Sequence, residues 1–390
     1  MSAKNSASTA YSAARYAHPF FLPAAPAQRT PHKGQHQMTD WSKKQLGPVP
    51  PVVRGGRMDL SEIIGADGVK EIQDLGELRF HALGDSGVGQ AQEAENIAAE
   101  MATDYKVGAG GVNPAFLFHL GDVIYGPGKE QHYPDRFYRP YRHYPGKILA
   151  IPGNHDGEVV SQVDNPSLSG FQANFCAANA AIPPSVAGIG IYRETMTQPG
   201  VYWLLEAPFV RIIGLYSNKL ENPGYLQGIS AKGKADTSQL DWLSATLSTI
   251  AKSKDKKGLI LATHHPPYSA SGHSGSQEMH QSILDILTKT GVTPDAFLSA
   301  HAHNYQRYTR RMGGKQVPYI VVGTGGMPPQ PVQPATGQPA DATHQVTYDT
   351  AVSSLGYLYV TASATQLKFE FWQLGSQHTT PFDPLTVPIN

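Results

Sequence analysis

The chain has 390 residues, of which 40% are hydrophobic and 16% are charged. This length and composition allow one large globular domain, or two small ones, with a substantial core. Its 31 basic and 31 acidic residues cancel, so overall charge does not favour nucleic acid or an anionic membrane as the main partner.

The sequence shows neither a disulfide framework nor a membrane-spanning segment. Cys176 is the single cysteine, so no intrachain disulfide can form, and we expect a buried apolar side chain there. No run approaches the ~18 apolar residues that a membrane span requires. The first 30 residues are broken by proline and histidine and lack the apolar segment of a secretory signal. These features slightly favour a reducing, cytoplasmic compartment, and an oxidising one stays open.

Residues 1–75 are predicted to form an N-terminal arm before the main domain, which we place at 76–390. Residues 1–56 are rich in Ser, Ala, Pro, Gln and Lys with little periodicity, which predicts an extended or partly disordered segment. Residues 58–75 carry apolar residues at helical spacing, with a break at 65–68.

From residue 78 onward, apolar strands alternate with turns and helices. The strands are predicted at 78–83, 115–120 and 147–151, and the first helix at 91–105. Each strand leads directly into a turn that contains glycine. This alternation is typical of an α/β sheet, in which ligands bind at the carboxyl ends of the strands.

The second half of the chain adds a hairpin, two helices and further strands. Apolar periodicity predicts the helices at 237–252 and 276–290. The strands are predicted at 202–206, 209–216, 259–263, 296–300, 319–322, 356–362 and 366–372. Two βα halves with an antiparallel finish predict an α/β fold, with mixed sheets packed together and helices outside. We interpret it as a four-layer α/β/β/α sandwich, although periodicity alone does not determine the order of the layers.

Five turns at the ends of predicted strands carry side chains of the types that bind metals. These side chains are carboxylates, an amide and imidazoles: Asp85, Asp122, Asn154, His264, His301 and His303. Such a mixture of oxygen and nitrogen ligands suits Fe, Zn or Mn rather than Ca. One carboxylate can bridge two cations about 3.5–4 Å apart. A single Gly-Asp is more often only a turn, but five such turns in this order predict a two-metal site that hydrolyses phosphate esters.

The ordered set of turns resembles the calcineurin-like metallophosphoesterases, and more narrowly the purple acid phosphatases. Members of the general family usually carry Asp-x-His in the first motif, whereas this chain has Asp85-Ser86-Gly87. In the second motif, Tyr125 follows Asp122 by three residues. That pair of differences is typical of purple acid phosphatases, in which a tyrosinate replaces the histidine on an iron(III) ion.

The resemblance covers about residues 78–372 and implies a role for each ligand position. The iron(III) ligands would be Asp85, Tyr125 and His303. The ligands of a divalent second ion, which is Fe, Zn or Mn, would be Asn154, His264 and His301. The carboxylate that bridges the two ions would be Asp122.

Three further histidines lie near these positions in the sequence. His264 is preferred over His265 as the ligand because the family ligand lies two residues before a proline, here Pro266. For His265, packing or solvent contact is favoured. By the resemblance, His155 binds phosphate without binding metal and can protonate the leaving group. His273 lies nine residues after His264, which is the family spacing of a second such histidine.

One ligand turn departs from the family pattern. The family usually has glycine before the first histidine of His-x-His, and this chain has Ala300. Alanine would be strained there if the position needs a positive φ, and nearly neutral if the backbone is extended. We expect the extended backbone.

These residues predict an acid phosphatase-like enzyme that hydrolyses small phosphate monoesters with a metal-activated water. A phosphodiesterase or nucleotide phosphatase is the first alternative, since substrate choice lies in the loops at 126–142, 161–192 and 327–344. A non-catalytic metal-binding protein is the second. Neither nucleic acid nor a membrane is an expected partner, and the oligomeric state stays open. The resemblance favours an extracytoplasmic location, whereas the single cysteine slightly favours a cytoplasmic one.

The first of these loops is rich in aromatic and basic residues: Tyr133, Arg136, Tyr138, Arg139, Tyr141 and Arg142. These side chains could stack on a nucleotide and bind its phosphates. A surface loop that is packed together by its own tyrosines is an equally good interpretation, and the sequence does not separate the two.

Overall fold

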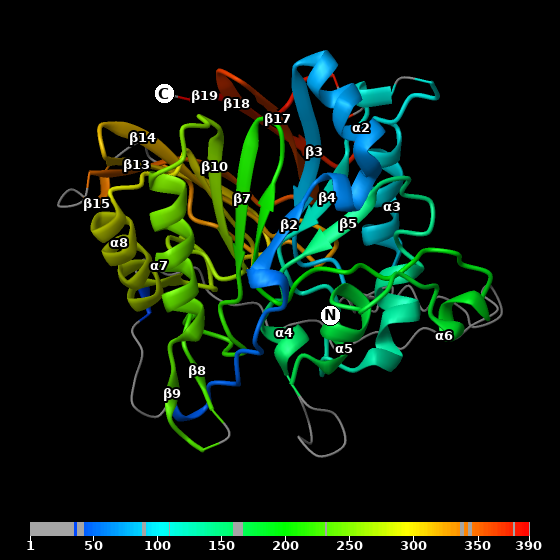
Figure 1. Ribbon diagram of the computed structural model, residues 1–390, viewed down its shortest axis with the longest axis horizontal. Coiled ribbons are helices and arrows are strands. Elements are labelled where there is room, and N and C mark those ends of the chain that lie inside the picture. Colours follow the sequence, from blue (N-terminus) through cyan, green and yellow to red (C-terminus); the bar gives the residue numbers. More distant parts are fainter. Residues whose placement is uncertain are drawn as a thin grey trace, which may run out of the picture.

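Two large mixed sheets lie between two sets of helices in this computed structural model (Figure 1). Helices α7 and α8, at Ser238–Ala251 and Gln277–Thr290, flank one side, and α3, at Ala91–Ala102, lies on the other. This arrangement confirms the predicted α/β class with helices outside two sheets. The structure describes residues 35–36, 43–87, 91–108, 110–158, 167–230, 232–335, 339–341, 345–376 and 379–389.

The larger sheet has nine strands in the order β15-β16-β13-β14-β12-β10-β7-β6-β2. In that order the strands are Pro339–Asp341, Val346–Val352, Tyr305–Met312, Lys315–Val322, Ala296–Ser299, Gly258–Thr263, Val210–Leu215, Trp203–Glu206 and Arg57–Asp59. The four strands from β14 to β7 run parallel, and β6 closes the predicted hairpin with β7. Strands β7 and β10 are buried at every residue, as expected for central parallel strands.

The smaller sheet has six strands in the order β19-β18-β17-β3-β4-β5. They are Asp383–Pro388, Gln366–Gln373, Gly356–Ser363, Glu77–Leu83, Phe116–His119 and Lys147–Ala150. Strands β3, β4 and β5 are parallel, and the three others pair antiparallel. Five of these strands match the sequence prediction closely; β19 was not predicted.

The remaining elements are short, apart from α2 at Ser61–Leu75. The short helices are α4 Asn154–Gly157, α5 Ser169–Phe175, α6 Pro184–Ala187, η2 Arg54–Gly56, η3 Gly110–Val112, η4 Glu130–His132 and η5 Pro134–Tyr138. The two-stranded pairs are β1 Gln35–His36 with β11 Gly275–Ser276, and β8 Gly228–Ile229 with β9 Ala235–Asp236. Within the described part of the chain, none of the helices has the length and apolar character to cross a bilayer.

Alternate residues of the central strands account for the order of the layers. Ile212 and Ile260 pack into the core between the two sheets. Their neighbours Ile213 and Leu261 pack outward, into the cluster formed with α7 and α8. Successive side chains of a strand point to opposite faces, so each strand serves two layers. On the far face of the smaller sheet, Leu117 packs in the cluster that contains the apolar residues of α3.

Part of the predicted N-terminal arm packs into the main domain. Strand β2 pairs in parallel with β6, and Leu60 and Ile72 are buried in the core between the sheets. The predicted break in the helix is present, because Gly65 has φ 79° and ψ 163° inside α2. The boundary at residues 75 and 76 stays a prediction, and residues 1–34 and 37–42 lie outside the described residues.

Candidate metal centre

The five predicted turns meet where the carboxyl ends of the two sheets come together. Asp85, Asp122 and Asn154 follow β3, β4 and β5 of the smaller sheet, and His264 and His301 follow β10 and β12 of the larger sheet. Ligand sites of α/β folds lie at such carboxyl ends. The site is therefore built from both sheets, by residues separated by more than 200 positions in the sequence.

One group of side chains centres on Tyr125. Its hydroxyl donates to Asp85 Oδ1 at 2.8 Å and lies 3.1 Å from Nε2 of His303. His303 Nε2 is 3.7 Å from the same carboxylate oxygen. All three side chains are buried. The structure thus brings together the three side chains that the resemblance assigned to iron(III).

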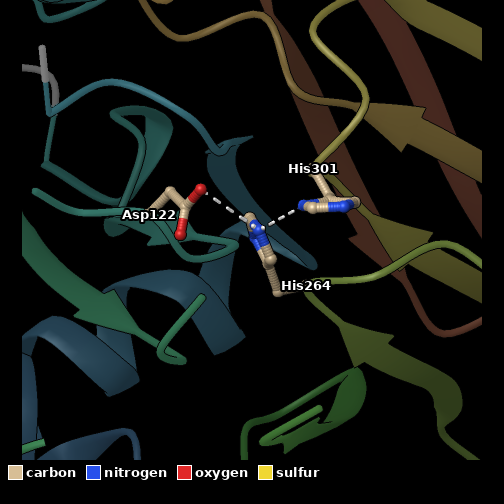
Figure 2. A group of neighbouring side chains, drawn as sticks. All are labelled: Asp122, His264 and His301. Atoms are coloured by element: carbon tan, nitrogen blue, oxygen red, sulfur yellow. Dashed lines mark hydrogen bonds and ion pairs between the residues drawn. The ribbon is translucent and has the colours of Figure 1, made fainter. Parts of the chain in front are cut away.

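A second group centres on Nε2 of His264. This atom lies 3.2 Å from Asn154 Oδ1, 3.2 Å from His301 Nδ1 and 3.4 Å from Asp122 Oδ2. Figure 2 shows the Asp122 carboxylate and the His301 ring approaching the His264 ring from opposite sides. Asp122, His264 and His301 offer ligand atoms that all lie within 4.8 Å of one another. These are the residues assigned to the divalent ion and to the bridge.

Asp122 contacts both groups. Its carboxylate pairs with His264 on one side, and on the other its charge acts on Tyr125, where it helps to raise the pKa of the hydroxyl. Its Oδ1 also accepts the backbone N–H of His155 at 2.9 Å. A carboxylate between two sets of ligands is the arrangement that a bridging ligand requires.

The donor and acceptor chemistry of the second group fits a cation. The Nδ1–H of His264 donates to the Leu120 carbonyl at 2.9 Å, which leaves the lone pair of Nε2 facing the site. The Asn154 amide nitrogen donates to Glu221 at 3.3 Å, so its oxygen faces the same point. Converging acceptors repel one another unless a proton or a metal ion lies among them. An imidazole, amide and carboxylate set of this kind suits Fe, Zn or Mn.

The acid–base equilibria of the buried groups agree with that fit. Burial opposes the charge of His264, but the Asp122 carboxylate raises the pKa of His264 to about 9. Burial raises the pKa of Asp85 to about 7. Burial, and then the Asp85 carboxylate, raise the pKa of the Tyr125 hydroxyl well above its ordinary value. A bound cation would reverse these preferences, because it favours the deprotonated form of each group.

Three of the predicted ligands adopt left-handed backbone conformations. The φ angles are 61° at Asp85, 52° at Asp122 and 66° at His301. Such angles are uncommon for residues other than glycine and cluster at functional sites. Ala300 lies outside this region, so alanine causes no backbone strain there, and its neighbour His301 holds the left-handed position.

Glycines bring the ligand turns close together. Gly121 has φ 102°, and a Cβ there would lie 2.6 Å from Nδ1 of His264. A Cβ at Gly323 would lie 2.5 Å from Oδ2 of Asp85. Neither position has room for a side chain, because the ligand side chains already occupy the space. The turn that begins at Gly323 also holds Asp85, whose carbonyl accepts the backbone N–H of Met327 at 2.9 Å.

The two predicted outer histidines lie beside the ligand groups. The ring of His155 is 4.6 Å from that of Tyr125, and its Nδ1 pairs with Glu158 at 2.9 Å. Burial opposes its charge, but Asp122 and Glu158 raise the pKa of His155 to about 10. The ring of His273 lies 4.2 Å from that of His301 and 5.2 Å from that of His303.

His265 has no ring nitrogen left for a metal. Its Nε2–H donates to the Leu220 carbonyl at 2.7 Å, and its Nδ1 accepts the Ser217 hydroxyl at 2.8 Å. Burial lowers the pKa of His265 to about 3, which keeps the ring neutral. Of the two adjacent histidines, only His264 therefore faces the candidate centre.

Sequence reasoning missed several polar residues at the site. Asp156 accepts the backbone N–H groups of Gly153, Val123 and Ile124 at 2.8, 3.1 and 3.2 Å, which joins two ligand turns. Asp156 is the last residue of the Gly-Asn-His-Asp turn, and this place in a ligand turn is the sequence feature that could have identified it. No sequence feature could have identified Glu221, because it does not belong to any motif. Gln330, also without a motif, lies 2.9 Å from Nε2 of His273.

The aromatic loop that could have held a nucleotide is packed into the core. Tyr133, Tyr138 and Tyr141 are at most 1% exposed and belong to the cluster beneath α3. Arg136 donates to the Tyr125 carbonyl, and Arg142 pairs with Glu95. The packing interpretation of this loop is therefore the correct one. The two other candidate loops include residues outside the described ones, at 161–166, 336–338 and 342–344.

This fold, with mixed metal ligands at the strand ends of two sheets, defines the class of metal-dependent phosphoesterases. A family model described as calcineurin-like phosphoesterase matches residues 78–305, which is more than half of the chain. The chain belongs to this family. Membership supports metal-dependent hydrolysis of phosphoesters as its chemistry. No curated protein matches the chain.

Solved structures with very different sequences share the fold. One is the purple acid phosphatase PPD1 from yellow lupin seeds, with a TM-score of 0.55 and 16% identity, over 80% of this chain and 53% of that one. Another is GAP50 of Plasmodium, with a TM-score of 0.54 and 13% identity, over 80% of this chain and 89% of that one. The chain thus spans about half the length of the lupin enzyme.

Proposed function

We propose that this chain is a phosphoric monoester hydrolase with a binuclear metal centre of the purple acid phosphatase type. The observation that carries the proposal is the contact of the Tyr125 hydroxyl with Asp85 at 2.8 Å and with His303 at 3.1 Å. The first motif has Gly87 where the wider family usually has histidine. A phenol that contacts two ligands beside this missing histidine supports an iron(III) site.

The assignment of ligands follows the two groups of side chains. Iron(III) would be bound by Asp85, Tyr125 and His303. A divalent ion, Fe, Zn or Mn, would be bound by Asn154, His264 and His301, with Asp122 between the ions. When bound, two cations supply Lewis acidity that neutralises phosphoryl charge and makes a water molecule nucleophilic.

The chain itself supplies binding and proton transfer. His155 is protonated over the ordinary pH range, since its pKa is raised to about 10 against the effect of burial, by Asp122 and Glu158. Its ring lies against Tyr125, where it can donate to the oxygen of the leaving group. His273 has a matching place beside the His-x-His turn and is held by Gln330. We assign both histidines to phosphate binding.

A non-catalytic protein on this fold is the main rival. GAP50 is described as the anchor in the inner membrane complex of Plasmodium, so the fold is compatible with a role of that kind. In this chain, however, all seven ligand positions carry ligand residues and form two converging groups. That arrangement costs stability through buried charge, and a protein without a metal gains nothing from it.

Metal analysis and a visible spectrum of the purified protein test the proposal together with turnover of p-nitrophenyl phosphate. We expect about two metal ions per chain, one of them iron, with a purple colour from the tyrosinate. Asp122→Asn abolishes turnover, and Tyr125→Phe removes the colour. The control Tyr348→Phe, a buried tyrosine of another cluster, keeps both.

Each alternative has its own result in the same experiment. A colourless protein with zinc or manganese alone would refute the iron type and make Tyr125 a bystander. A metal-loaded wild type without turnover of mono- or diesters would refute the hydrolase. Faster turnover of bis(p-nitrophenyl) phosphate than of the monoester would favour a phosphodiesterase.

A further inference from the structure

Glu221 lies beside the centre without belonging to any recognised motif. It follows β7, which pairs in parallel with β10, the strand that leads to His264. Its Oε2 accepts the amide N–H of Asn154 at 3.3 Å, and its Oε1 lies 3.9 Å from Nδ1 of His273. It also groups with His155 and Glu158, with all three ligand atoms within 4.8 Å.

The contact with Asn154 decides which end of the amide faces the second metal position. An amide group has a donor end and an acceptor end that differ little in shape. With the nitrogen bonded to Glu221, the oxygen lies 3.2 Å from Nε2 of His264. If the amide turned over, its N–H groups would point at the ion, and one ligand would be lost.

The segment that carries Glu221 is held in place by its own hydrogen bonds. The Leu220 carbonyl and the Ser217 hydroxyl bind the two ring nitrogens of His265, at 2.7 and 2.8 Å. Ser217 Oγ also accepts the backbone N–H of His265 at 3.1 Å. The histidine that does not face the metal thus anchors the segment next to Glu221, and the carboxylate is presented from a fixed backbone.

We infer that Glu221 is a positioning residue that orients Asn154 as a ligand of the second ion. This inference rests on the proposed function. Partners that orient metal ligands are worth about 10- to 100-fold in metal affinity. The carboxylate also adds negative charge near two cations, but orientation and charge can be separated, because glutamine retains an acceptor oxygen and removes only the charge.

The test compares Glu221→Ala and Glu221→Gln with the wild type. Metal content of the purified proteins is measured by elemental analysis, together with the rate of metal loss to a chelator such as dipicolinate. We expect Glu221→Ala to lose the divalent ion while it keeps iron and colour, with affinity for that ion lower by about 10- to 100-fold. Glu221→Gln keeps both ions.

Glu158→Ala is the matched control. Glu158 belongs to the same acidic group and is about equally exposed, at 39% against 40% for Glu221, but its hydrogen bond goes to His155. It is expected to retain both ions. Glu221→Met, which keeps the length of the side chain without an acceptor, should repeat the alanine result, so that a folding defect of one variant does not decide the outcome.

The kcat of the variants provides a second test of the role of Glu221. With excess divalent metal, Glu221→Ala should regain most of its kcat, since saturation replaces the lost ion. Unchanged metal retention in Glu221→Ala and Glu221→Met, beside a two-metal wild type, would overturn the inference and leave the proposed function intact. Equal loss in Glu221→Gln would also overturn it, because charge rather than orientation would be responsible. A wild type without metal would overturn both.

Discussion

Gly84 and Ala300 face each other across the boundary between the two sheets, and only one of them has a side chain. A Cβ built on Gly84 would lie 2.5 Å from the Cβ of Ala300. Gly84 precedes Asp85, and Ala300 precedes His301, so this contact joins a ligand turn of each sheet. The missing glycine of the His-x-His turn is thus accommodated by a glycine on the opposite strand.

This relationship predicts a compensating pair of substitutions. Gly84→Ala should lower the free energy of unfolding by about 1–3 kcal/mol, because two Cβ atoms cannot lie that close. Adding Ala300→Gly should restore most of the loss, since the remaining neighbours of the new methyl group are 3.3 Å away. Urea unfolding of the four proteins measures the coupling. Strictly additive effects would contradict the contact.

Asp156 should support the centre without binding metal. Its carboxylate accepts three backbone N–H groups of two ligand turns, and an amide side chain can satisfy fewer of them. We expect Asp156→Asn to lose metal to a chelator about 10- to 100-fold faster than the wild type. Asp74→Asn, on the exposed surface of α2, is the control and should behave as the wild type does. Equal rates for both variants would argue against this role.

An ionic contact should hold β13 of the larger sheet to β19, an edge strand of the smaller sheet. Arg307 of β13 binds Asp383 of β19 through two contacts, Nε to Oδ2 at 2.6 Å and Nη2 to Oδ1 at 3.1 Å. The side chains are 16% and 11% exposed, so Arg307→Ala leaves a largely buried carboxylate without its cation, although the Tyr305 hydroxyl still donates to it at 2.8 Å. We expect a loss of about 2–3 kcal/mol, somewhat below the cost for a fully buried pair.

Thermal and urea unfolding measure that loss. Lys70→Ala is the matched control, because Lys70 and Asp74 form an ion pair with 70% and 65% exposure. Exposed pairs of this kind contribute about 0–1 kcal/mol. A loss in Arg307→Ala no larger than in Lys70→Ala would show that the two sheets do not depend on this contact.

His119 should make the protein less stable in mild acid. Burial lowers the pKa of His119 from 6.5 to about 3 in the folded chain, where its Nδ1 accepts the Gly121 N–H at 3.3 Å and its Nε2–H donates to Ser86 Oγ at 2.7 Å. Between those pH values the unfolded chain binds a proton that the folded chain does not. Stability is therefore complete above about pH 6.5 and falls as pH falls, by up to about 1.4 kcal/mol per pH unit for this group.

His119→Gln keeps a side-chain N–H that can donate to Ser86 and removes the titrating group. Metal-loaded wild type and variant are unfolded with urea at intervals from pH 7 to pH 4.5. The variant should show the shallower dependence on pH, with the difference growing steadily below pH 6.5. Parallel curves would mean that His119 titrates alike in both states. Metal content of both proteins is measured at each pH, so that acid release of metal is separated from the titration of His119.

Most of the fold followed from apolar periodicity, and strand β13 shows how one strand could be missed. Strand β13 contains Arg307, Arg310 and Arg311, so its sequence does not show apolar alternation. It forms because Tyr305 and Tyr308 are buried while Arg307 reaches Asp383 and Arg310 reaches the Tyr268 hydroxyl. Those partners come from distant segments. Local pattern therefore cannot distinguish such a strand from a loop.

The residues of the site also fall into those that the sequence could predict and those that it could not. Asp85, Asp122 and Asn154 could be predicted because each occupies a turn directly after an apolar strand, and the carboxyl ends of parallel strands meet. The choice of His264 over His265 came from spacing to Pro266, and the hydrogen bonds of His265 agree with it. Glu221 could not be predicted, because its role depends on a contact with a residue 67 positions away.

By itself, the sequence determined the class of fold, the ligand types and their order, since strand periodicity and turn chemistry are local properties of the chain. Only the tertiary structure decided which ligands share a neighbourhood. Tyr125 and His303 are 178 positions apart, and their contact exists because the two sheets pack face to face. The same packing places Gly84 against Ala300, and no local pattern could have shown that a missing glycine on one strand is matched by a glycine on another.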